Sequence, residues 1–574
     1  MLAAPPQKPP FGGAAKAKQT TPKTKNYQPK TKNQHTMKRR IISTVLALAA
    51  FCMLVLGLSG CYTDNVFIPQ EPLAAFSDNV NAARQVPGGT VTLRLSMQAA
   101  GGLKELVVRR GTVEIFKRPY TDKFLDRLEL VDTIPTTARE NDVLTYSIAL
   151  TDVQGRTAPQ LEYRVTVVGA TFNVADTLVA GQQMRRVRGN INANYTFAAN
   201  RSWFLDGAVF VDEGRTLTIE PGTRIYARFG GMNLASMLII SQGATIIAEG
   251  TRENPIVMTS ERALRNQAQR GDWAGLVING RAQTSAGAGS VIPGGVGAYG
   301  GMNDADNSGS LRYIRVEYAG QILPNTGSFQ LNGISFHGVG NGTKAEYLTV
   351  FNSANQGIRF YGGTVNVKYA AVFGSGQYEF RADFGWRGNG QFWLGVQRRD
   401  TAAERVFELR NSPDGSNNTA EPRTDGTIAN FTGIGPGQAS GFPNYGLRVR
   451  NGSFGRLYNG ILTEMPENAI RFDNFTAADL GVRGIFANSY LFNNRRNNHS
   501  GALLFIEQAR FNNALTAVSG IGLDNFVGSG ASNFNPQSLG SFFSPAQYSG
   551  AIQNAANDWT RGGWVRELNG QIRQ

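Results

Sequence analysis

Cysteine and histidine are almost absent from this chain of 574 residues, which contains two cysteines and three histidines. Cys52 and Cys61 both lie near the amino terminus, so the chain beyond residue 61 has no thiol for a disulfide, a zinc cluster or a nucleophile. Only His337 and His499 occur beyond that point, at unrelated positions, which argues against a histidine-rich metal site. We therefore expect stability from packing alone, with no metal and no cofactor.

Acidic residues are missing from residues 1–60, which hold ten of the 57 lysines and arginines. The formal net charge of +15 therefore falls to +5 for the remainder, a mildly basic balance that does not indicate a nucleic-acid partner. Residues 1–36 are rich in Lys, Pro, Gln and Thr and cannot bury a core. We predict that they precede the true start at Met37 as a mis-assigned or disordered extension, a basic tail being the alternative.

A basic and then an apolar segment precedes Cys61. Lys38-Arg39-Arg40 is followed by the apolar residues 41–58, an order typical of a secretory signal. Leu58-Ser59-Gly60-Cys61 resembles the lipobox of bacterial lipoproteins, in which the cysteine matching Cys61 receives a diacylglyceryl group and the preceding peptide is removed. We predict a signal peptide over 37–61 and a lipid anchor at Cys61, with a membrane-spanning helix over 41–58 as the alternative.

The resemblance to lipoproteins also implies a location. The residue after Cys61 is Tyr62 rather than aspartate, which favours the outer membrane. We expect an outer-membrane lipoprotein that faces either the periplasm or the cell surface.

Helical periodicity is weak throughout, and the first folded region alternates apolar and polar residues as half-buried strands do. The expected strands are 90–97, 103–108, 112–116, 144–150 and 163–168. The turn at 151–155 resembles that of bacterial immunoglobulin-like surface modules, which act as spacers or binding arms. We predict an immunoglobulin-like β-sandwich over 62–170.

Short strands separated by Gly, Asn and Pro-Gly turns recur beyond residue 170. Tyr313, Tyr347 and Tyr369 occupy equivalent positions in three similar segments. A pattern of small, apolar, polar and apolar residues also recurs, at 333–336, 357–360, 446–449 and 469–472. Such recurrence indicates stacked parallel strands. We predict a right-handed parallel β-helix over 171–525 and a C-terminal cap segment over 526–574, in an all-β chain.

Several segments of the predicted solenoid resemble a group of β-helix surface lipoproteins from Bacteroidota. They are 254–260, 271–280, 352–366, 385–393 and the closing 550–560. The resemblance covers nearly all of 190–574 and implies fold and location, but no established activity. Segments of that group that match 354–359 and 377–383 are usually acidic. Here Glu379 and Asp383 alone remain, so we expect no metal site.

Three arginines, Arg359, Arg448 and Arg471, share one position of the recurring four-residue pattern. On stacked coils they would form an outward basic stripe, which Arg381 and Arg387 would extend. Guanidinium groups pair with carboxylate or sulfate, and Tyr361 or Trp386 alongside would pack on sugar rings. The alternative is that outward strand positions only need long soluble side chains. We expect the other tryptophans in core or end-cap packing: Trp273, Trp393, Trp559 and Trp564.

Carboxylates that could serve a polysaccharide-cutting enzyme are Glu379, Asp383, Glu464 and Asp473, and none forms a recognisable motif with another. We therefore predict no enzyme but a protein of surface binding, adhesion or scaffolding, with an acidic polysaccharide or a surface protein as its partner besides the membrane. A β-helix lyase or hydrolase is the alternative.

Overall fold

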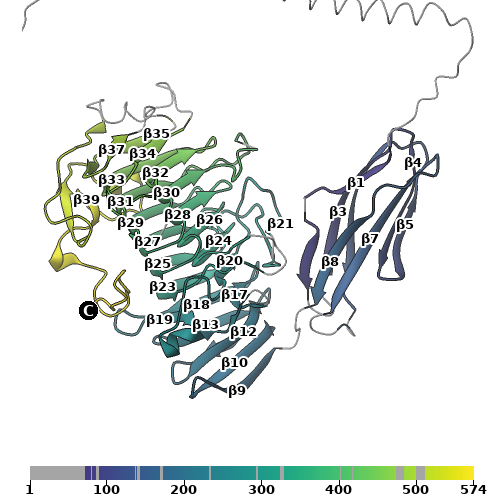
Figure 1. Ribbon diagram of the computed structural model, residues 1–574, viewed down its shortest axis with the longest axis horizontal. Helices are drawn as coiled ribbons and strands as arrows, with labels where there is room; N and C mark the ends of the chain where they lie inside the picture. The colour runs from purple at the N-terminus through teal and green to yellow at the C-terminus, as the bar shows by residue number, and fades with distance from the viewer. Residues whose placement is uncertain are drawn as a thin grey trace, which may run out of the picture. The chain divides into compact units, whose positions relative to one another are not determined.

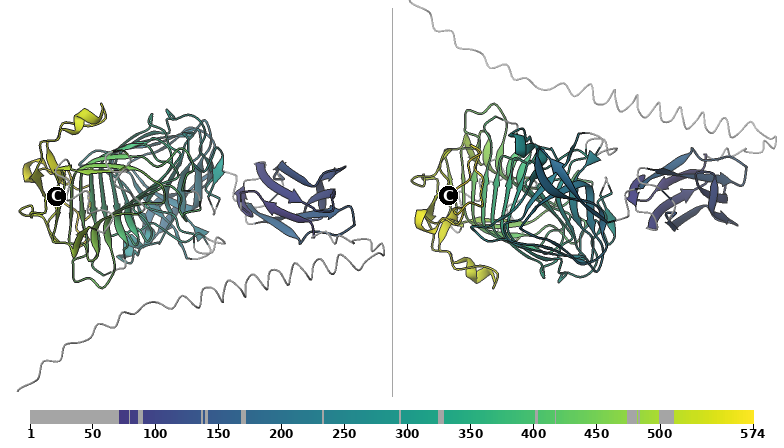
Figure 2. Two further views of the ribbon diagram at one scale, coloured as in Figure 1. Left: turned by 90° about the horizontal axis from the view of Figure 1, so that it is seen from above. Right: turned by 90° about the horizontal axis from the view of Figure 1, so that it is seen from below.

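A computed structural model describes residues 71–574 apart from 79, 86–89, 136–137, 139–141, 168–171, 232–233, 293–294, 324–328, 401–402, 417, 474–481, 483 and 499–510 (Figures 1 and 2). The predicted signal peptide, Cys61 and His499 lie outside these residues. Within the described ranges, no helix is both long and apolar enough to cross a membrane. The helical elements there are short 3-10 turns, Glu261–Arg265, Pro536–Leu539 and Ala555–Asn557.

The alternating segments of the first region form two layers, and the predicted β-sandwich is confirmed in outline. One sheet contains, in spatial order, β1 (Leu73–Phe76), β3 (Thr90–Gln98) and β6 (Leu125–Thr133). The other contains β2 (Ala82–Gln85), β8 (Leu161–Val167), β7 (Val143–Asp152), β4 (Leu103–Arg110) and β5 (Val113–Pro119). Neighbours are antiparallel except β2 and β8.

The core of the sandwich lies between the two sheets. Leu93 and Leu95 of β3 meet Leu106, Val108 and Tyr146 of the second sheet, and all five are buried. Leu93 and Leu95 are separated by the more exposed Arg94, and burial alternates along the whole of β3 as the sequence predicts. The relation to immunoglobulin modules stays a prediction.

Parallel strands from β10 onward stack coil upon coil, as predicted for a β-helix (Figure 2). Sheet I runs through β11 (Tyr195–Phe197), β13 (Thr216–Ile219), β18 (Thr245–Glu249), the first halves of β23 (Gly309–Glu317), β25 (Lys344–Phe351), β27 (Asn366–Phe373), β29 (Asn389–Val396), β31 (Thr427–Ile434) and β33 (Gly455–Thr463), and β35 (Gly484–Ala487).

Sheet II runs through the first halves of β10 (Gln182–Ile191) and β12 (Ser202–Val211), β14 (Arg224–Ala227), β19 (Ile256–Ser260), the second halves of the long strands β23 to β33, and β36 (Tyr490–Phe492).

Sheet III runs through the second halves of β10 and β12, then β17 (Met237–Ile240), β20 (Gly275–Asn279), β24 (Ile334–His337), β26 (Ile358–Tyr361), β28 (Tyr378–Asp383), β30 (Arg405–Arg410), β32 (Tyr445–Arg450), β34 (Asn468–Phe472) and β37 (Arg496–Asn498).

Short antiparallel elements complete the solenoid. They are β9 (Asn173–Val179) beside β10, and the pairs β15 (Phe229–Gly230) with β16 (Leu234–Ala235), β21 (Ser290–Val291) with β22 (Ala298–Tyr299), and β38 (Gly528–Ala531) with β39 (Tyr548–Ile552).

The interior of the coils is a continuous apolar column. Phe336 stacks on Phe360, and Phe380 stacks on Phe407, at centroid distances of 5.5 and 5.3 Å. Trp393 lies between Phe360 and Phe380, parallel to both rings. Trp273 and Trp564 are likewise buried, so the expected packing role of these tryptophans is confirmed, and Trp559 is partly buried against Trp564.

The long strands bend between sheets I and II at residues with left-handed backbone. Tyr313, Tyr347, Tyr369 and Phe392 have φ of 48°, 53°, 59° and 60°, and their rings stack at successive distances of 4.4, 4.4 and 4.7 Å. The predicted equivalence of the three tyrosines is therefore confirmed. A non-glycine residue in this region costs about 1–2 kcal/mol, and ring stacking offsets about 0.5–1.5 kcal/mol of it per pair.

The C-terminal residues, for which we predict a cap over 526–574, contact the side of the solenoid. They form a strap along these bends: Lys368 Nζ donates to Phe542 O at 2.6 Å and Gln391 Nε2 to Ser544 O at 2.9 Å. Further on, Arg566 pairs with Glu317 of β23 at 2.7 Å. The strap thus turns back towards coils that precede it by some 250 residues, at the yellow end of the chain in Figure 1.

Asn430 ties the strap to the coils and gives a test of this arrangement. It is buried at a left-handed bend, and its Nδ2 donates to Tyr548 O at 2.6 Å and Ala546 O at 3.2 Å. Asn430→Ala would remove the bond to Tyr548 O and one of the bonds to Ala546 O, to which Asn459 Nδ2 and Tyr548 N also donate, at a cost of about 1–3 kcal/mol. We expect a clearly lower urea midpoint than for the parent chain.

The control is Asn493→Ala, because Asn493 has the same φ of 51° but is exposed and makes one bond of 3.3 Å to Glu464. Asn493→Ala also places an alanine in the left-handed conformation, so it has the same backbone strain. It should lower the urea midpoint much less. Equal shifts for the two variants would contradict a stabilising strap.

Candidate functional site

The outward side of sheet III carries arginines at one register position on successive coils. Strand pairing aligns Arg359 of β26 with Arg381 of β28, then Glu408 of β30, then Arg448 of β32 and Arg471 of β34. The predicted alignment of Arg359, Arg448 and Arg471 is therefore confirmed, and Arg381 belongs to the same column. Parallel strands lie about 4.8 Å apart, so these side chains are neighbours.

Two flanking columns add to this set. On one side Tyr361 aligns with Asp383, and Arg410 aligns with Arg450 further along. On the other side Tyr378 aligns with Arg405 and then with Tyr445. We call the charged residues of the three columns, with Asp473 and Glu404 that contact them, the arginine ladder. They are Arg359, Arg381, Asp383, Glu404, Arg405, Glu408, Arg410, Arg448, Arg450, Arg471 and Asp473.

Shared carboxylates hold the ladder together. Asp383 Oδ2 lies 2.7 Å from both Arg359 Nη2 and Arg381 Nη2. Glu408 lies 2.9 Å from Arg405 Nε and 2.7 Å from Arg450 Nε. These carboxylates are buried, and each neutralises one charge of the pair that it joins.

Asp473 plays the same part at the far end of the ladder. It accepts from Arg448 Nη2 at 2.5 Å and from Arg471 Nε at 2.6 Å. Burial raises the pKa of Asp473, but its hydrogen bonds to Arg471 and Arg448 outweigh that effect and hold the pKa below the usual value. The carboxylate is therefore charged whenever the two arginines are.

Guanidinium groups outnumber carboxylates in the ladder by seven to four. Arg410 shows where the surplus lies. Its nearest carboxylate atoms, on Asp383 and Glu408, are 3.8 and 3.9 Å away, and its side chain is only 9% exposed. Among the described residues no hydrogen bond to the Arg410 guanidinium is found. A buried cation with free donors favours an anionic oxygen as ligand.

Arg359 and Arg381 differ in electrostatic environment although they share Asp383. Burial lowers the pKa of Arg381, and the neighbouring Arg359 lowers it further. For Arg359 burial also acts to lower the pKa, but Asp383 outweighs it and raises the value. Arg381 is thus the less favourably neutralised cation of the two.

Aromatic rings border the ladder. The Arg359 guanidinium lies 3.9 Å from the ring centroid of Tyr361, which is buried and stacks against Phe384. At the other end Tyr445 is partly exposed, and Arg405, Arg448 and Arg471 lie 5.4–5.8 Å from its ring centroid. Sequence reasoning missed Tyr445, although it lies just before the repeated segment 446–449.

Two predicted members of the stripe lie elsewhere. Trp386 is 0% exposed, stacks on Phe360 at 4.7 Å and donates from Nε1 to Val365 O, so the prediction that it packs on sugar rings is wrong. It follows β28 on the inward-turning segment after Asp383. Arg387 pairs with Asp304 at 2.9 Å and is not part of the ladder.

The four carboxylates considered for catalysis are dispersed. Asp383 and Asp473 belong to the ladder, whereas Glu379 points into the coil interior beside Val406 and Gly395 and is fully buried. Glu464 lies at a left-handed bend and accepts from Asn493. Within the described part of the chain, no three His, Cys, Asp or Glu side chains are grouped as for a metal ion.

His337 is the one histidine that the structure describes beyond the first 70 residues. It is fully buried, its Nδ1 lies 2.9 Å from Asn279 Oδ1, and its ring contacts Tyr361 edge-on. Burial, with a smaller effect of Arg359, lowers its pKa to about 3. The ring is therefore neutral at physiological pH and adds no charge beside the ladder.

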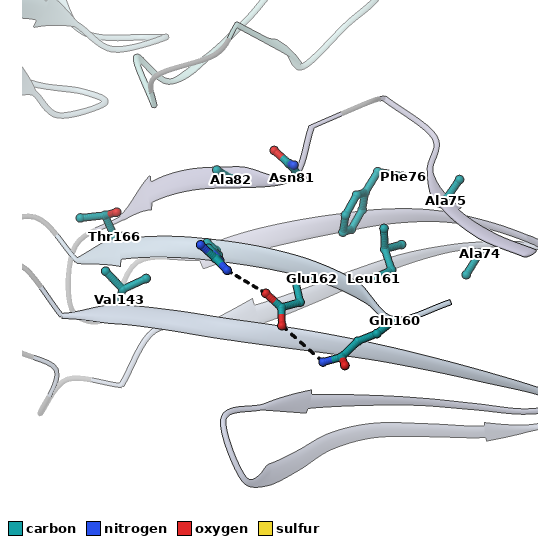
Figure 3. A pocket seen from close by; sticks show the side chains of 11 residues that line it. Ala74, Ala75, Phe76, Asn81, Ala82, Val143, Gln160, Leu161, Glu162 and Thr166 are labelled. Carbon is teal, nitrogen blue, oxygen red and sulfur yellow. Dashed lines mark hydrogen bonds and ion pairs between the residues drawn. The ribbon is translucent and has the colours of Figure 1, made fainter. Parts of the chain in front are cut away.

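The sandwich and the flank of the solenoid each contain a hollow without a comparable surplus of charge. The first, of about 870 Å³, lies beside Phe76 and Leu161, and its polar residues Gln160, Glu162 and Arg164 bond to one another (Figure 3). The second, of about 310 Å³, has an apolar floor and charged residues that pair with one another at its rim. The arginine ladder is thus the stronger candidate site.

The fold defines a solenoid of parallel strands whose outward face carries a charged site. A family model described as a pectate-lyase-like β-helix domain matches residues 189–533, and the chain belongs to this family. The description of this family indicates a group of polysaccharide-related proteins. Neither a curated protein nor a solved structure matches the chain.

The protonation state of Glu379, which lies in the coil interior, can be tested by experiment. Burial raises its pKa well above the usual value, so the folded chain prefers the protonated acid. Its contribution to stability is complete below the unfolded pKa of about 4.3 and is lost as the pH rises through the folded pKa. Glu379→Gln should therefore unfold at a higher temperature than the parent at pH 8, and the difference should shrink towards pH 4.

The control is Glu464→Gln, at a partly exposed position. It removes no buried carboxyl from the coil interior, so its melting temperature should not rise above that of the parent at pH 8. A Glu379→Gln curve parallel to the parent curve would contradict a protonated Glu379.

Proposed function

We propose that this chain is a lipid-anchored protein of the cell envelope whose β-helix binds an acidic polysaccharide along the arginine ladder. The observation that carries the proposal is the surplus of guanidinium groups in three neighbouring columns, the main one of which has arginine on four of five successive coils and Glu408 on the coil between them. Membership of a polysaccharide-related family supports a glycan rather than another polyanion as the ligand.

The geometry suits a repeating ligand. A column of cations about 4.8 Å apart can pair with carboxylate or sulfate groups on successive sugars, and guanidinium groups do so through two parallel hydrogen bonds. Arg410 has donors free for such a group, and Tyr445 offers an apolar ring face beside Arg448 and Arg471. Adhesion or scaffolding at the surface would follow from the same binding.

Binding is tested at the exposed end of the ladder. Arg448 and Arg471 share Asp473, so their joint replacement by glutamine removes two cations and leaves one carboxylate. A hydrogen bond to a charged group contributes about 1.5–3 kcal/mol, so affinity for polygalacturonate or a sulfated glycan should fall at least about tenfold. Isothermal titration would measure it, and added salt should weaken parent binding.

Arg387→Gln is the control, because Arg387 has a similar exposure but pairs with Asp304 away from the ladder. It should bind as the parent does. Equal binding of a neutral glucan, or no binding of any glycan by the parent, would reject the glycan-binding function and leave a scaffold.

The anchor is tested separately. Cells that express the chain should incorporate labelled fatty acid into it, and Cys61→Ser should abolish the label, since Cys61 is the predicted acceptor. Label that persists in Cys61→Ser would reject this anchor.

A polysaccharide lyase is the second candidate, favoured by the environment of Arg381. Burial and Arg359 lower the pKa of Arg381, which favours loss of its proton to solvent, and the neutral guanidine so formed would take a proton from a uronate held by its neighbours. Incubation with polygalacturonate and detection of unsaturated chain ends by ultraviolet absorbance would test it. New ends that Arg381→Gln abolishes would establish the enzyme, and binding without new ends would reject it.

A further inference from the structure

One end of the β-sandwich exposes four large apolar side chains. Leu73, Phe124, Leu125 and Val153 are 48%, 59%, 64% and 53% exposed, and we call them the apolar tip. They come from the start of β1, the turn before β6, the start of β6 and the turn after β7. Val113, Val131 and Val143 are exposed to a similar degree towards the other end, but among the described residues of the sandwich the exposed leucine and phenylalanine side chains gather at this end, and such a cluster calls for a binding role.

Strand pairing and turn contacts bring the four together. Leu73 and Leu125 both align with Gln98, from opposite sides of β3. Phe124 and Val153 both approach Gly102, since a Cβ there would lie 3.8 Å from Phe124 and 3.5 Å from Val153. The four residues of the apolar tip therefore lie at one end of the sandwich and come from both sheets, with the exposed Gln98 between Leu73 and Leu125.

Backbone hydrogen bonds hold this surface in place. Ala99 N donates to Phe124 O at 2.9 Å, Leu103 N to Lys123 O at 2.6 Å, and Val153 N to Gly102 O at 3.0 Å. The exposed side chains thus project from a bonded set of turns. Their exposure is a property of the fold.

The predicted lipid anchor is close in sequence to the apolar tip, which points to a lipid surface as its partner. β1 begins at this end, and Glu71 lies ten residues after the predicted lipid-bearing Cys61. Ten residues reach at most about 35 Å, so Glu71, just before β1, stays within that distance of the lipid surface. The end of the sandwich at which β1 begins is therefore the tethered end.

We propose that the apolar tip inserts into the lipid surface to which Cys61 tethers the chain, so that the membrane contacts the protein at two points. This inference rests on the lipid anchor proposed above but not on glycan binding. Aromatic and leucine side chains enter the boundary between headgroups and acyl chains to a depth of about 5–10 Å. Lys123, half exposed beside Phe124, can keep its ammonium group among the headgroups.

The test uses the whole chain, produced with its signal so that the anchor is attached, and reconstituted into phosphatidylcholine–phosphatidylglycerol vesicles. Leu125→Cys carries a polarity-sensitive fluorophore; Cys61 is then occupied by lipid and Cys52 removed with the signal, so the label is specific. Val131→Cys is the matched control, because Val131 is 58% exposed on the same strand but six residues away from the apolar tip. Vesicles contain a lipid with a nitroxide near its headgroup.

We expect the probe at position 125 to shift to shorter wavelength and to lose fluorescence to the nitroxide, and the probe at 131 to do neither. Flotation of the protein with vesicles while position 125 remains unquenched would overturn tip insertion and leave the anchor intact. Failure to float would overturn both. A spectral shift at position 125 that depends on protein concentration and occurs without vesicles would show a second copy on this surface and would also overturn the proposal.

Discussion

The parallel register of sheet III is the constraint on which both the core and the candidate site depend. Strand pairing places Ile358 against Phe380 on the inner side and Arg359 against Arg381 on the outer side. A shift of one residue would bring the arginines into the apolar column and expose the rings. The hydrophobic interior therefore fixes the alignment of the charges, and no contact among the outward-facing side chains is needed to set it.

The ladder lowers the stability of the fold, and packing elsewhere in the solenoid offsets this loss. Buried guanidinium groups lose hydration, and a shared carboxylate returns only part of it, because Asp383 serves two close arginines and a more distant third. Replacing these residues by apolar ones would improve stability by this reasoning. Their presence on a face that is already well packed is consistent with selection for binding rather than for folding.

Much of this arrangement was predictable from the recurring sequence patterns. The sequence predicted that Tyr313, Tyr347 and Tyr369 occupy equivalent positions, at which their rings stack, and the recurring Arg359, Arg448 and Arg471 predicted the main column. Periodicity gives register, because each coil repeats the same alternation. Periodicity could not predict that Asp473 and Asp383 are each shared by two arginines, since such sharing depends on how far side chains reach between columns.

The residues that the sequence analysis misplaced or missed have physical explanations as well. Trp386 follows a strand but lies in a turn whose direction no alternation encodes, and there the apolar interior takes the ring. The strap has few regular elements, so its path along the bends follows from single contacts such as that of Asn430 with Tyr548. Arg405 and Arg410 lie in a segment without the repeated small residue and were not noticed.

The path of the strap also sets the order in which the protein can be finished. Glu317 of β23 is buried together with Arg315, and its second partner, Arg566, lies near the end of the chain. Because a polypeptide is synthesised from its amino terminus, Arg566 is added long after Glu317. Until then Glu317 pairs with Arg315 alone, so the middle coils acquire this second ion pair, and the strap that carries it, only at the end of synthesis.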